Sequence, residues 1–131
     1  MIGLSDLRAV SRGRLKDADV LQRAGRFDGA FYVCGYAIEI ALKARACRTL
    51  KWPGFPETIS EFGALQSFKT HSLEVLLKLS GTEIKIKTKF IAEWSVLVHW
   101  NPESRYRKIG TATKQDAIDM IAAAKKLLGA L

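Results

Sequence analysis

Cysteine and histidine are scarce in this sequence, which holds two of each: Cys34, Cys47, His71 and His99. Both cysteines fall in one expected helix, where 13 residues at ~1.5 Å per residue put them roughly 20 Å apart. A disulfide between them within that helix is therefore excluded. The spacing of the four residues matches no metal-binding motif. We expect reduced, buried, structural cysteines, no metal site and no cofactor.

Long apolar runs are absent as well. No stretch approaches the ~20 apolar residues that a membrane-spanning helix needs. The first ten residues, MIGLSDLRAV, include charged side chains and lack the apolar core of a signal peptide. These two absences predict a cytoplasmic protein with no membrane partner.

The motifs of the common enzyme classes are also missing. The sequence has no glycine-rich phosphate-binding loop, no nucleophile elbow and no paired zinc ligands. Asp17 and Asp19 have no companion acid cluster, so nothing supports a metal-dependent mechanism. The sequence therefore favours a binding or interaction protein over an enzyme.

What the chain does have is an ordinary globular composition and an unusual charge. Its 131 residues suit a single domain, spanning residues 1–131, and 48% of them are hydrophobic. The formal net charge is +8 and the sequence pI is about 9.7. Such a basic protein favours polyanionic partners, whether nucleic acid, nucleotides or an acidic protein.

Residues 25–50 form the longest stretch with helical periodicity and no proline. Because this stretch is apolar on most sides, we expect a central helix packed by several others. The polar side chains of Tyr36, Glu39 and Lys43 lie inside this apolar stretch. Glu39 and Lys43 are four residues apart in the favourable order for an ion pair. We expect Tyr36 and Glu39 to form a polar core, which is either purely structural or part of a functional site.

The segment before the central helix predicts an amphipathic first helix, capped by Ser5. The short break around Gly25 makes this helix an antiparallel neighbour of the central one. A second stripe on the first helix is basic. It is either a solvated face or an electrostatic footprint for phosphate groups, and it consists of Arg8, Arg12, Lys16 and Arg23.

After the central helix, the chain is expected to continue as shorter helices. Residues 51–56 form a loop with two prolines and a glycine. A short helical turn is expected at 58–65. Thr70 would then cap a helix over residues 71–79, which Gly81 ends.

Residues 83–90 alternate apolar residues with lysine, which is typical of a strand. The chain offers no second strand, however, and a helical stripe also continues to Val98, so we predict one helix here. Thr113 and Asp116 resemble a capping box that begins a last helix. The fold class that follows is an all-α, single-domain antiparallel bundle of about five helices.

Three separated stretches together resemble one known family. They are GRFDGAFYVCGYAIEIALKA at Gly25–Ala44, FKTHSLEVLL at Phe68–Leu77 and WNPESRY at Trp100–Tyr106. In this order and spacing they are similar to the HEPN domain, the helical module named for its occurrence in higher eukaryotes and prokaryotes. The resemblance runs from about Leu4 to the C-terminal helix.

The resemblance implies a helical bundle that is commonly a homodimer. Many HEPN domains are metal-independent RNases of toxin or defence type, whereas others bind nucleotides or accompany a minimal nucleotidyltransferase in a toxin–antitoxin pair. The RNase branch places an arginine shortly before a histidine. In this sequence no arginine occurs in the 20 residues before His71 or His99. The departure argues against RNase activity. The pair Arg105-Tyr106 after Pro102 instead resembles the non-catalytic, nucleotide-binding branch of the family.

Three hypotheses follow. The first is a HEPN-like binding module, a homodimer that recognises the phosphate groups of a nucleotide or RNA through a basic surface. The second is a divergent metal-independent RNase, with His99 as general base and Arg105 stabilising the transition state. The third is an accessory subunit that docks a nucleotidyltransferase. The ligand contacts expected under the first hypothesis are Lys43, His99, Arg105, Tyr106 and Arg107.

Overall fold

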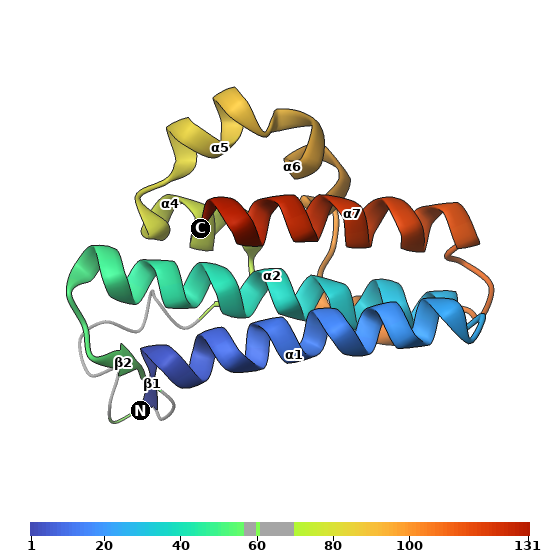
Figure 1. The fold of residues 1–131 in the computed structure, drawn as a ribbon, viewed down its shortest axis with the longest axis horizontal. Helices are drawn as coiled ribbons and strands as arrows, with labels where there is room; N and C mark the ends of the chain where they lie inside the picture. Colours follow the sequence, from blue (N-terminus) through green and yellow to red (C-terminus); the bar gives the residue numbers. More distant parts are fainter. Residues whose placement is uncertain (57–59, 61–69) are drawn as a thin grey trace.

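Helices account for most of the chain. The computed structural model describes residues 1–56, 60 and 70–131, without the side chains of Ser104 and Arg105. Within these residues there are six α-helices, a 3-10 helix and a two-stranded sheet (Figure 1). The α-helices are α1 (Leu4–Arg23), α2 (Phe27–Leu50), α4 (Leu73–Ser80), α5 (Glu83–Lys89), α6 (Ile91–Leu97) and α7 (Lys114–Ala130). The other elements are β1 (Ile2–Gly3), β2 (Gly54–Phe55) and η2 (Pro102–Tyr106).

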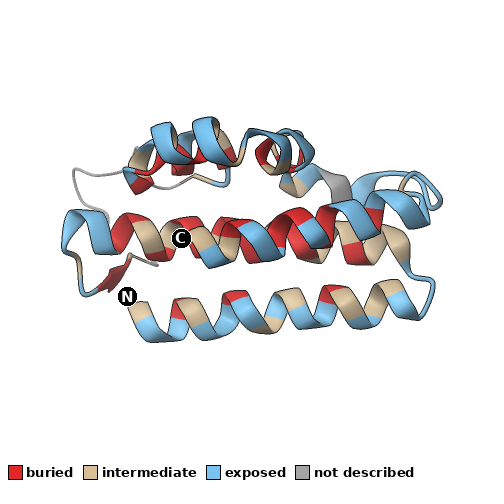
Figure 2. Cartoon of the chain, turned by 45° about the horizontal axis from the view of Figure 1, so that its top comes forward, coloured by how far each residue is buried: buried red, intermediate tan, exposed pale blue. Residues whose placement is uncertain are grey.

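The long helices α1, α2 and α7 lie side by side, and α4, α5 and α6 cover one side of them (Figure 1). Helix α1 turns into α2 at Gly25, whose positive φ of 77° suits a glycine. Consequently α1 and α2 are antiparallel neighbours, as the short break predicts. Figure 2 shows that the buried residues of α1 lie along the side that faces the other long helices. The expected all-α bundle is therefore confirmed.

Helix α2 is the centre of the core. Its buried residues lie on most of its sides, and it packs against α1, α4 and α7. Ile38 and Leu42 are almost completely buried, next to leucines of α4 and α6 and Met120 of α7. Burying each such side chain stabilises the fold by about 1.5–3 kcal/mol. The apolar run that predicts a central helix thus corresponds to the main packing element.

Two further predictions are confirmed. Thr113 accepts a hydrogen bond from the Asp116 backbone N–H, and Asp116 accepts one from the backbone N–H of Thr113, which completes the capping box of α7. Both cysteines are free and buried. Burial raises the pKa of the Cys34 thiol to about 12, so this thiol stays protonated at neutral pH.

Several predicted helix ends are wrong. Helix α1 starts two residues earlier than predicted, with Gly3 rather than Ser5 at the cap. Ser72 caps α4 by accepting from the Val75 backbone N–H, while Thr70 instead accepts from the Ser72 backbone N–H. A polar residue one or two positions away can satisfy the same free N–H groups, so the pattern does not choose among them.

The region from 83 to 98 is helical, which confirms the choice of helix over strand, but it is not one helix. The backbone breaks at Phe90, with φ −128° and ψ 29°, and separates α5 from α6. The short helical turn expected at 58–65 lies outside the described residues except for Ser60.

The N-terminus and the loop after α2 form a small sheet that the sequence does not predict. β1 and β2 pair antiparallel, with Ile2 opposite Phe55 and Gly3 opposite Gly54. Phe55 is 4% exposed, in a small apolar cluster with Leu7, Ala44 and Cys47. Phe55 therefore belongs to the core and not to the exposed surface. None of the described helices combines the length and apolarity of a membrane-spanning segment.

Candidate functional site

The segment from residue 99 to residue 112, here called the anchored loop, is attached to α2 at its start by Trp100. The Trp100 indole Nε1 donates a 3.1 Å hydrogen bond to the Tyr32 carbonyl oxygen, and its ring meets Tyr36 edge-to-face at 5.0 Å between centroids. The ring also lies directly over Gly35, where a Cβ atom would approach Trp100 to 2.0 Å. Only a residue without a side chain allows this contact.

Asp28 holds the other end of the anchored loop. Its carboxylate accepts hydrogen bonds from the backbone N–H groups of Gly110 and Ala112, at 2.7 Å and 2.8 Å. These hydrogen bonds lower the pKa of the Asp28 carboxyl, and the bond from Ala112 has a larger effect than the bond from Gly110. This attachment therefore stabilises the fold at neutral pH and weakens as the pH falls through that lowered pKa.

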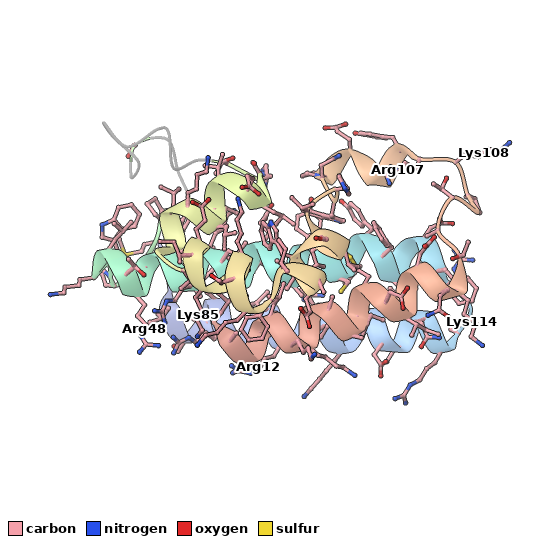
Figure 3. The ribbon with its side chains drawn as sticks, turned by 90° about the horizontal axis from the view of Figure 1, so that it is seen from above. Arg12, Arg48, Lys85, Arg107, Lys108 and Lys114 are labelled. Carbon is pink, nitrogen blue, oxygen red and sulfur yellow. The ribbon has the colours of Figure 1, made fainter. Side chains whose placement is uncertain are left out.

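The anchored loop presents basic and aromatic side chains, with His99 directly before the attachment at Trp100 and with Tyr106 and Arg107 between the two attachments. His99 and Arg107 are exposed, and Tyr106 in η2 is 72% exposed. Figure 3 shows Arg107 and Lys108 at one end of the molecule, away from Arg48 and Lys85. Four of the five predicted ligand contacts, at positions 99, 105, 106 and 107, thus belong to one short segment. The side chain of Arg105 lies outside the described part.

The fifth predicted contact, Lys43, lies elsewhere. Its ammonium group is 3.5 Å from Glu39 Oε2 and 5.2 Å from the centroid of the Phe55 ring. Lys43 follows Tyr36 by seven residues, which is roughly 10 Å along α2 from the aromatic contact of Trp100. The structure therefore does not join Lys43 to the anchored loop.

Glu39 is the centre of a second polar group on α2. It is 3% exposed, and its Oε1 accepts a 2.8 Å hydrogen bond from Nδ1 of His71, just before α4. The His71 side chain is itself 63% exposed. Tyr36, expected beside Glu39 in a polar core, receives a 3.3 Å hydrogen bond from the Tyr32 hydroxyl. The partners of Glu39 are thus His71 and Lys43, and the ring of Tyr36 belongs to the aromatic contact of Trp100.

Two of these residues have roles that the sequence does not predict. His71 and Asp28 each form a hydrogen bond that connects segments far apart in the chain, which residue spacing alone does not reveal. The one available signal for His71 is its place inside a stretch that resembles a known family. Among the described residues, no group of three or more histidine, cysteine, aspartate or glutamate side chains is arranged to hold a metal ion.

Comparison with known proteins gives one match. The family model described as the HEPN domain matches residues 5–131. Searches of curated proteins and of solved structures gave no significant match. The match covers nearly all of the chain, including α2, the residues around His71 and the anchored loop, and it implies a nucleotide- or RNA-related function in general terms. The chain belongs to the HEPN domain family.

Proposed function

We propose that this chain is a binding module that recognises the phosphate groups of a nucleotide or RNA through the anchored loop. The observation that carries the proposal is that Trp100 and Asp28 hold both ends of a loop whose exposed side chains include His99, Tyr106 and Arg107. A surface held in place before binding loses less conformational entropy when a ligand arrives.

The residue types of the loop suit such a ligand. The guanidinium of Arg107 forms no ion pair in the described part of the chain, and its planar fork matches phosphate oxygens. The exposed ring of Tyr106 offers a face on which a base can stack. Arg105 and His99 complete the proposed contact set. Lys43 is left out, because Glu39 and Phe55 already surround its ammonium group.

A binding assay tests this function. We expect the purified chain to bind a mixed RNA pool or nucleoside triphosphates, and Arg107→Gln to weaken binding by about 1–3 kcal/mol through the loss of charge-assisted hydrogen bonds. Lys78→Gln, on exposed α4 surface, removes the same charge and serves as the matched control. Equal effects of the two substitutions would contradict a specific role of the loop.

RNA cleavage is the second candidate function, and one observation favours it. A buried carboxylate orients His71 through Nδ1 and leaves Nε2 of an exposed ring available as a general base. His99 has no such partner in the described part of the chain. Metal-free cleavage of RNA that is abolished by His71→Ala or His99→Ala would replace the binding-module proposal with this one. The absence of both cleavage and RNA or nucleotide binding would favour an accessory subunit of a nucleotidyltransferase.

The proposed module acts as a homodimer, on the basis of the family alone. Sedimentation of the protein at roughly tens of micromolar is expected to give the mass of the dimer. This concentration is well above the dissociation constants of typical obligate dimers. A monomer at that concentration would count against the homodimer.

A further inference from the structure

A separate cavity lies between α1, α2 and the C-terminal end of α7. Its volume is about 460 Å³, within the usual range for small-ligand pockets. Four cationic side chains line it: Arg8 and Arg12 from α1, Arg45 from α2 and Lys125 from α7. We call this cavity the basic groove.

The side chains that line the basic groove carry positive charge only. None of the side chains that line the groove is acidic, and none of its four cations forms an ion pair within the described residues. On α1, by contrast, Arg14 and Arg23 pair with Asp17 and Asp19. Like charges that surround one cavity repel each other, so an anion in the groove would relieve an unfavourable interaction.

Arg45 adds a more specific observation. Its Nε atom is buried and has no hydrogen-bond partner in the described part of the molecule. A buried donor without an acceptor is rare in folded proteins and costs free energy. An anionic oxygen bound in the groove is a chemically suitable acceptor for this N–H.

The floor of the basic groove is apolar. Leu15, Ala41, Ala44 and Leu128 contribute to it, and the Ser11 hydroxyl is already committed, since it donates a 2.7 Å hydrogen bond to the Ala37 carbonyl oxygen. Cations thus line an otherwise apolar cavity. Ionic contacts in a partly desolvated place are stronger than on open surface.

The basic groove is distinct from the anchored loop. Arg45 follows Tyr36 by nine residues, which places it roughly 14 Å further along α2 than the aromatic contact of Trp100. Figure 3 also shows Arg12 and Arg107 on opposite edges of the molecule. Binding at the two places can therefore be measured separately.

We infer that the basic groove is a binding site for a chain of phosphate groups, carried either by a nucleoside triphosphate or by free polyphosphate. A phosphate chain carries several negative charges within a few ångströms, which matches four cations around one cavity. The guanidinium groups of Arg8, Arg12 and Arg45 each offer a planar fork of donors, and Lys125 adds a point charge from the third helix.

Calorimetry on the full chain at low salt tests this site, with ATP and inorganic triphosphate as probes. Arg45→Met keeps an apolar stem and removes the guanidinium, so we expect it to lower the affinity for both probes by about tenfold or more. Arg12 is exposed, so Arg12→Gln should leave the packing intact. We expect this substitution to lower the affinity for both probes as well. Lys114→Gln removes the same charge at the other end of α7 and should change the affinity less than about twofold.

The two probes distinguish the sources of the phosphate chain. Tighter binding of ATP indicates that the apolar floor takes part of the nucleoside, whereas equal binding indicates that the phosphate chain alone is recognised. Failure of both probes to bind would overturn the assignment, as would equal effects of Lys114→Gln and Arg45→Met. Loss of binding in Arg107→Gln but not in Arg45→Met would also overturn it, by moving the phosphates to the anchored loop.

Discussion

At the scale of single residues, Glu39 shows how one buried charge connects two parts of the chain, α2 and the segment before α4. Its carboxylate accepts from His71 before α4 and lies near Lys43 on its own helix, while only 4% of the side chain is exposed. Removing it strands a largely buried lysine, so Glu39→Ala should lower the free energy of unfolding by about 3 kcal/mol. Chemical denaturation measures this loss.

A control for Glu39 is available on α1. Asp17 pairs with Arg14, but about half of each side chain is exposed, so water screens the pair. Asp17→Ala is expected to change the free energy of unfolding by less than about 1 kcal/mol. If Glu39→Ala cost no more than Asp17→Ala, the group around Glu39 would be solvated and weakly coupled.

At the scale of elements, the contact of Trp100 with α2 sets the position of the anchored loop. Because a Cβ at position 35 would lie 2.0 Å from the ring, Gly35→Ala must displace Trp100. We expect a loss of about 1–3 kcal/mol in the free energy of unfolding. A changed near-ultraviolet circular dichroism spectrum should accompany the loss, since the indole ring moves.

Gly13 in α1 provides the matched substitution. A Cβ built there has no atom within 4 Å, so Gly13→Ala adds only helix propensity and should stabilise the protein by about 0.5–1 kcal/mol. Stabilisation by Gly35→Ala of similar size would show that Trp100 does not pack on α2 in solution.

The sequence predicts the elements whose signal is local. Helix α2 follows from a long apolar periodicity, and the start of α7 follows from the capping box of Thr113 and Asp116. The break at Phe90 has no such signal, because residues 83–98 contain no glycine or proline. The pairing of β1 with β2 also has no local signal, because each strand has only two residues.

At the scale of the whole molecule, the sites depend on contacts between distant segments. His71 meets Glu39 across 32 positions, and Asp28 meets Gly110 across 82. Periodicity within one helix carries no information about such pairs. The basic stripe on α1 illustrates the limit: the pattern predicts a charged face, but only the packing of three helices shows that Arg8 and Arg12 share a cavity with Arg45.

The central claim is that the anchored loop contacts phosphate groups, and the salt dependence of RNA binding tests it most directly. Each phosphate contact with single-stranded nucleic acid contributes about 0.7 to the slope of log affinity against log salt concentration. We expect a clear negative slope for the natural sequence and a slope shallower by about 0.7 for Arg107→Gln. Lys78→Gln should leave the slope unchanged. A flat slope for the natural sequence, or the same reduction in both variants, would contradict the account.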